Sequence, residues 1–140
     1  MSTQGKEVVV TWFTPDIEHG DTFYTDSNGL EMQERKLNYR PTWDFSSAMN
    51  ISSNFYPINS AMAIRDETKL LQMTIMNDRS QAGSVIEKGK FEFLLNRRLY
   101  YDDRRGVGEP LNETDAYGNG ITVHSSYKLH FFNTFIEASV

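Results

Sequence analysis

Apolar and polar residues alternate with a period of two along much of the chain. The alternation is clearest at residues 8–13, 70–75, 91–96 and 127–132. Because successive side chains of a β-strand point to opposite faces of its sheet, this period predicts strands with one buried face. Turn-forming sequences separate the stretches, at residues 26–29, 65–68, 77–80 and 117–120. The pattern therefore predicts an all-β fold, specifically an antiparallel β-sandwich.

The segment at residues 30–37, LEMQERKL, does not fit this pattern. Nearly all of its residues are good helix formers, so propensity alone predicts a short helix. The segment directly follows Asn28-Gly29, a pair that tolerates the positive φ of a tight hairpin turn. That position predicts a return strand instead, and neighbouring strands can override a propensity of this size.

Composition narrows the class of protein. At 140 residues the chain is long enough for one domain with a core, so we expect a single domain at residues 1–140. Its 14 basic and 19 acidic residues give a net charge of −5, which argues against a nucleic-acid partner. No apolar run approaches the about 18 residues of a membrane span. Residues 1–6 lack the pattern of a signal peptide. The chain has no cysteine, which excludes disulfides and thiol chemistry.

The three histidines do not form a metal-binding pattern. A zinc site needs ligands at short, regular spacing on one face. His124 and His130 would share a face only if one strand ran unbroken between them, and no carboxylate lies nearby. We interpret them, together with His19, as solvent-facing strand residues and expect no metal site in this chain.

The run YYDDRRGVGEPL, residues 100–111, is a candidate site loop. Asp102 and Asp103 suggest a carboxylate pair for acid–base chemistry, but adjacent strand residues point to opposite faces, so these carboxylates would diverge. Gly106 lets the backbone bend and can direct the guanidinium of Arg105 at a ligand. The alternative interpretation is a charged strand end in water.

Four aromatic residues raise a second hypothesis. Aromatic side chains on a β-sandwich can stack on sugars, and otherwise they belong to the core. If they stack on sugars, the chain is a stand-alone carbohydrate-binding module. If they belong to the core, the chain is a purely structural module. The residues concerned are Trp12, Trp43, Phe55 and Tyr56.

Four sequence blocks in a fixed order carry a family resemblance. They are FYTDSNGLEMQERKLNYRPTW (23–43), NFYPINS (54–60), MNDRSQAGS (76–84) and NRRLYYDDRRGVGEPL (96–111). Together they resemble the C-terminal β-sandwich region of glycoside hydrolase family 38, the retaining α-mannosidases, and most closely the lysosomal type. The similarity runs from about residue 7 to residue 132, and it implies that residues 30–37 form a strand. Residues 1–6 and 133–140 fit nothing in the family and are interpreted as flanking sequence.

The resemblance implies an enzyme that removes terminal α-mannose from N-linked oligosaccharides. Members of the family hold zinc in an N-terminal α/β catalytic domain, where one Asp is the nucleophile and a second acid protonates the leaving oxygen. This chain has no match to the H-x-D zinc segment, so its zinc ligands and catalytic residues are expected elsewhere. Since family members are much longer, we expect a fragment or processed piece of an α-mannosidase, inactive alone. A homo-oligomer remains an alternative.

The resemblance also assigns site residues. The Arg-Gly pair of the family's loop matches Arg105-Gly106. We therefore expect Arg105 and Asp103 at the edge of the substrate site, with Arg105 binding sugar hydroxyls or orienting an acid, and the aspartates shaping the loop. Asn50 and Asn112 begin N-x-S/T sequons and are expected to be glycosylated. The implied location is the lysosome or secretory pathway, with the vacuolar lumen as a variant.

Overall fold

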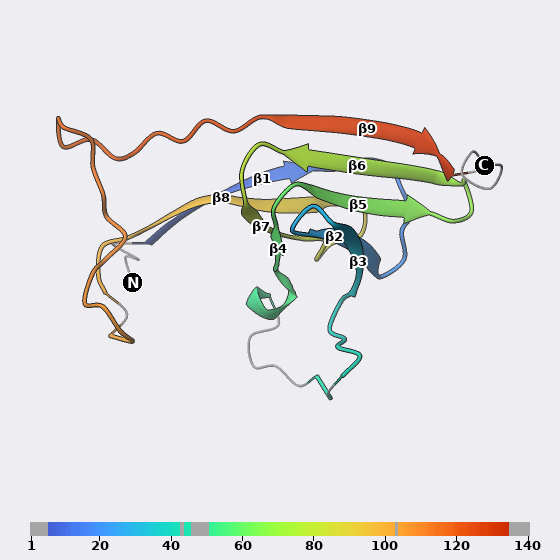
Figure 1. Ribbon diagram of the computed structural model, residues 1–140, viewed down its shortest axis with the longest axis horizontal. Helices are drawn as coiled ribbons and strands as arrows, with labels where there is room; N and C mark the ends of the chain where they lie inside the picture. The colour runs from blue at the N-terminus through green and yellow to red at the C-terminus, as the bar shows by residue number, and fades with distance from the viewer. Residues whose placement is uncertain (1–5, 43, 46–50, 103, 135–140) are drawn as a thin grey trace.

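The chain folds into two antiparallel β-sheets packed face to face. A computed structural model describes residues 6–42, 44–45, 51–102 and 104–134 (Figure 1). One sheet, sheet A, has the strand order β1-β8-β7-β4, and the other, sheet B, has the order β3-β2-β5-β6-β9. A 3-10 turn, η1 (Ser52–Asn54), precedes β4. The strands are β1 (Lys6–Phe13), β2 (Thr22–Ser27), β3 (Glu31–Lys36), β4 (Tyr56–Ile58), β5 (Ala61–Asp66), β6 (Leu71–Asn77), β7 (Gln81–Ser84), β8 (Phe91–Leu99) and β9 (Tyr127–Asn133). The predicted all-β sandwich is confirmed.

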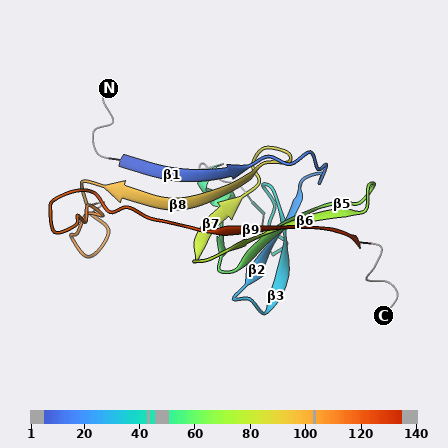
Figure 2. The ribbon, with the colours of Figure 1, turned by 90° about the horizontal axis from the view of Figure 1, so that it is seen from above.

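The core lies between the two sheets and is built from the predicted alternation. In β8, Phe91 and Phe93 are buried while Glu92 and Leu94 are less so, and in β6 Met73 and Ile75 are buried. The remaining core side chains come mainly from strands β2, β4 and β5, and they are Ile17, Phe23, Ile58, Met62, Ile64 and Val85. The sheets overlap only in part, since β1 and β8 run beyond sheet B at one end (Figure 2).

Residues 31–36 form strand β3, as the resemblance implied and against their helical propensity. The preceding turn explains this result. Asn28 and Gly29 both adopt positive φ, 53° and 71°, and β3 pairs with β2 in uninterrupted antiparallel register. The ladder of hydrogen bonds to β2 stabilises an extended chain that the residues would not choose alone.

The interpretation of His19 as a solvent-facing residue is wrong. Its imidazole is buried, with Nδ1 donating to the carbonyl of Thr22 at 2.9 Å and Nε2 accepting the N–H of Gly89 at 2.9 Å. It thereby joins the segment before β2 to the turn before β8, in the interior. His124 and His130 are exposed, and only His130 lies in a strand, so no single strand carries both.

Candidate functional site

The most prominent feature outside the sandwich is a long excursion between β8 and β9. We call residues 100–126 the arm. It extends from the end of β8 that runs beyond sheet B, at the left of Figure 1, and returns to β9 in the other sheet. The N–H of Leu99 donates to the carbonyl of Leu111 at 2.9 Å, which closes the loop containing residues 100–110. The candidate site loop is therefore held at the base of the arm.

A hairpin turn at residues 114–120 forms the tip of the arm. Asp115 organises it, because one carboxylate oxygen accepts the N–H of Tyr117 at 2.9 Å and that of Asn119 at 2.8 Å. These bonds favour the ionised form, and the bond from the Asn119 N–H contributes most to the lowered pKa of Asp115. The returning chain is then fixed near the sandwich, where Asp78 accepts the Ser126 N–H at 3.0 Å.

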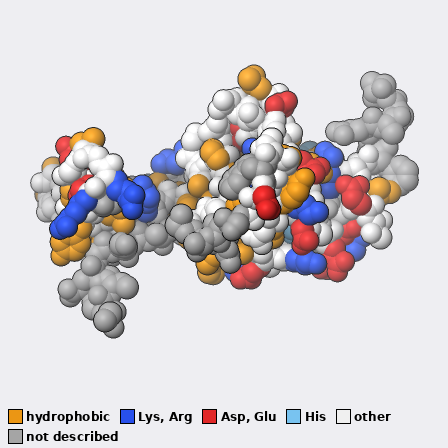
Figure 3. All heavy atoms as spheres, turned by 90° about the horizontal axis from the view of Figure 1, so that it is seen from below, with side chains coloured by type: hydrophobic (Ala, Val, Ile, Leu, Met, Phe, Trp, Pro, Cys, Tyr) orange, Lys and Arg blue, Asp and Glu red, His pale blue; other side chains and the backbone are white. Residues whose placement is uncertain are grey.

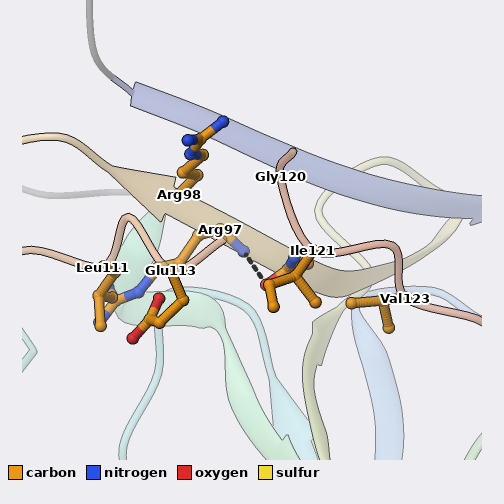
Figure 4. Close-up of a pocket in the computed structure, with 8 residues that line it drawn as sticks. Arg97, Arg98, Leu111, Glu113, Gly120, Ile121 and Val123 are labelled. Atoms are coloured by element: carbon orange, nitrogen blue, oxygen red, sulfur yellow. Dashed lines mark hydrogen bonds between the residues drawn. The ribbon is translucent and has the colours of Figure 1, made fainter. Parts of the chain in front are cut away.

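Two adjacent arginines stand at the root of the arm and leave opposite sides of β8 (Figure 4). Arg97 helps to line a pocket of about 450 Å³ with residues of the arm, namely Leu111, Glu113, Gly120, Ile121 and Val123. The guanidinium carbon of Arg98 lies 4.8 Å from the centroid of the Tyr100 ring. A Cβ placed on Gly120 would lie 3.1 Å from Nη1 of Arg98, so the absence of a side chain at Gly120 lets the returning backbone approach this cation.

The loop that holds Arg105 projects basic side chains into solvent. Asp102 accepts the backbone N–H of Arg104 at 2.7 Å, and Arg104 adopts a positive φ of 60°. Both Arg104 and Arg105 are exposed, and Lys and Arg side chains gather on the arm at the left of Figure 3. Asp102 thus shapes the turn. Its neighbour Asp103 lies outside the described residues.

The arm can present cations and hydrogen-bond donors, which suits it to bind hydroxyl or carboxylate groups. The described part of the chain contains no group of three or more side chains that could hold a metal ion. No helix among the same residues is long and apolar enough to cross a membrane. Of the two predicted glycosylation sites, Asn112 is exposed on the arm, and Asn50 lies outside the described residues.

The four aromatic residues of the second hypothesis do not form one platform. Trp12 and Phe55 line a common pocket on the outer face of sheet A. Tyr56 instead packs edge-to-face on core residue Phe23 at 5.8 Å, and the guanidinium carbons of Arg35 and Arg40 lie 4.5 and 4.9 Å from its ring centroid. The fourth member, Trp43, is outside the described residues.

Two charged residues beside Trp12 were missed in the sequence. Glu92 pairs with Trp12 across strands β8 and β1, and Lys90 places its Nζ 4.0 Å from the Trp12 ring centroid. The alternation of β1 already placed Trp12 and Phe13 on opposite faces. The partners of Trp12 depend on strand register, which the sequence does not specify.

Comparison with known proteins identifies the family. Residues 3–105 match the model of the glycosyl hydrolases family 38 C-terminal domain. The lysosomal alpha-mannosidase of Bos taurus is 45% identical over 123 residues, which cover 88% of this chain and 12% of that protein. The Homo sapiens protein of that name is 45% identical over 114 residues and the Dictyostelium discoideum one 40% over 110, covering 81% and 79% of this chain and 11% of each relative.

The chain therefore spans about an eighth or less of the length of these relatives. The family match nevertheless covers every strand of both sheets except β9, from β1 to the loop at the base of the arm. The chain belongs to the family of glycosyl hydrolase family 38 C-terminal domains.

Proposed function

We propose that this chain is the C-terminal β-domain of a zinc-dependent, retaining α-mannosidase that hydrolyses terminal α-mannose residues of N-linked oligosaccharides. The observation that carries the proposal is the 45% identity to lysosomal alpha-mannosidases over most of the chain, together with the family match. The names of these relatives also support a lysosomal or secretory location.

Within this proposal the catalytic groups belong to an N-terminal α/β domain of the same enzyme. The family resemblance assigns the zinc ligands to that domain. Retention requires two carboxyl groups, one that attacks the anomeric carbon and one that protonates the leaving oxygen. Asp102 is engaged with the backbone of its own turn, in keeping with a structural role.

The arm supplies the contribution of this domain to the substrate site. Arg105 stands on a loop closed by the Leu99–Leu111 bridge and set by the Asp102 turn. A guanidinium on this loop carries several donors in one plane, and it can bind mannose hydroxyls or orient an acidic group. We place Arg105 and Asp103 at the edge of the substrate site on the strength of the family's loop pattern.

The test is the stereochemistry of hydrolysis by the intact enzyme that contains this chain. Proton NMR of a reaction with an aryl α-mannoside should show α-mannose as the first product, before mutarotation. Removal of zinc with a chelator should abolish turnover, and added zinc should restore it, because zinc orients the sugar in the proposed site. β-Mannose as the first product, or full activity in the metal-free enzyme, would contradict the proposal.

A further inference from the structure

The outer face of sheet A carries a pocket that the proposed function does not use. Its volume is about 360 Å³, and we call it the Trp12 pocket. Register places two cross-strand pairs of β1 and β8 there, Val10 with Leu94 and Trp12 with Glu92, whereas Phe91 and Phe93 point into the core. The opposite wall comes from the η1 region, with Ile51, Ser52 and Phe55.

Large apolar side chains remain in water at this pocket. Trp12 is 60% exposed and Ile51 is 67% exposed. Burying apolar surface stabilises a protein or complex, so both side chains still have apolar area that a ligand can remove from water. Exposed apolar side chains that line one concavity mark a binding surface, whereas single scattered ones do not.

The pocket also contains a carboxylate that needs donors. Glu92 is only partly exposed, and no hydrogen-bond donor reaches its carboxylate within the described part of the chain. Its nearest cation, the Nζ of Lys90, lies 3.9 Å from Oε1, which is too long for a hydrogen bond. Burial raises the pKa of Glu92, and the charge of Lys90 only partly opposes this effect. The carboxylate has therefore lost water without gaining an equivalent partner.

These features together select one class of ligand. A pyranose ring has an apolar C–H face, which suits the negative face of an aromatic ring, and hydroxyl donors around its edge. An aliphatic side chain would fill the apolar walls but leave Glu92 without a donor, and an additional cation would compete with Lys90. We propose that the Trp12 pocket binds one hexose unit of an oligosaccharide, which stacks on Trp12 while hydroxyl groups donate to Glu92.

Lys90 lies over one face of the Trp12 ring and is not part of the lining of the pocket. Its ammonium is held beside the Trp12 ring and near Glu92, and it also pairs with Glu87 at 3.2 Å. Because the ammonium covers that face of the indole, the sugar stacks on the other face of Trp12, and its hydroxyl groups donate to Glu92. The pocket volume lies near the lower end of the range of small-molecule sites, as a single sugar unit requires.

The test uses the whole 140-residue chain, produced without N-glycans because Asn50 of one sequon directly precedes Ile51. Methyl α-mannoside is titrated while the indole N–H of Trp12 is followed by NMR. We expect a saturable shift with a dissociation constant on the order of 1 mM. Trp12→Ala, in which the backbone amide of Glu92 replaces the indole as the reporter, should weaken sugar binding by about tenfold or more, and Glu92→Gln should weaken it while leaving the apolar walls intact.

Leu30→Ala is the matched control, because Leu30 is an exposed apolar residue in the hairpin before β3. It should bind the sugar as the unaltered chain does. No saturable shift at the Trp12 indole, or equal affinity in the folded Glu92→Gln variant, would overturn the sugar assignment and leave this face as a protein-docking surface. The inference does not require the arm to reach an active site, so kinetic failure at Arg105 would not affect it.

Discussion

Asp26→Ala is expected to lower the free energy of unfolding by about 3–5 kcal/mol. The buried carboxylate of Asp26 accepts four backbone N–H groups, from Gly29 at 2.8 Å, Asn59 at 2.8 Å, Ser60 at 3.0 Å and Ala61 at 3.2 Å. It thus ties the β2–β3 hairpin to the start of β5. Alanine would leave these donors without their acceptor, and urea unfolding followed by circular dichroism measures the loss.

The pH dependence of stability checks the same bonds. Burial raises the pKa of Asp26, but the backbone hydrogen bonds together lower it below its ordinary value of 3.8. A carboxyl group with a lowered pKa in the folded state contributes its stabilisation above the unfolded pKa and loses it as the pH falls through the folded pKa. Stability should therefore decrease below about pH 4, and less steeply in Asp26→Asn than in the unaltered chain. Parallel pH profiles for both chains would rule out this role of Asp26.

Phe93→Ala is expected to cost about 3–5 kcal/mol through the cavity that it leaves. Phe93 is fully buried in β8, and its ring centroid lies 5.3 Å from that of Tyr127 and 6.0 Å from that of Phe13. The contact with Tyr127, in β9, joins sheet A to sheet B. Thermal and urea unfolding should both show the loss.

Val107→Ala is the control for the core substitution. Val107 is exposed on the arm, and its truncation creates no cavity, so its effect should lie within about 0.5 kcal/mol of zero. If Phe93→Ala were equally neutral, the two sheets would not depend on the packing described above.

The strands that could be predicted are those whose apolar and polar residues alternate, although in β9 the expected inner residues Leu129 and Phe131 are exposed. Period-two alternation identified β1, β6, β8 and β9. Strand β5 lacks the alternation because Met62, Ala63 and Ile64 are all buried, so both of its faces are covered there. Strand β7 is short and polar, and its Gly83 is fixed by packing, since a Cβ there would lie 2.2 Å from Cδ1 of Ile58. The burial of both faces of β5 and the packing around Gly83 depend on the partner strands, so neither could be predicted from the sequence alone.

In the candidate sites, too, features set by neighbouring residues could be predicted, whereas features set by distant partners could not. The alternation of β1 predicted that Trp12 and Phe13 lie on opposite faces, because that depends on neighbouring residues alone, whereas the loop-shaping role of Asp102 was implied by the family resemblance. The sequence could not show that Phe55 faces Trp12 whereas Tyr56 packs with Phe23 and the arginines, because that depends on how η1 crosses sheet A. It also missed His19 as a buried residue, since its partner Gly89 is 70 positions away in sequence.

We propose that the arm brings Arg105 to the substrate site of an α-mannosidase. The most direct measurement is the steady-state kinetics of the intact enzyme with Arg105→Ala, beside Arg104→Ala on the same loop. We expect kcat to fall on the order of 100-fold for Arg105→Ala, the effect of removing one fixed donor from a reacting site, with unfolding unchanged. Arg104→Ala should retain nearly full activity. Unaltered kinetics in a folded Arg105→Ala enzyme would contradict the account.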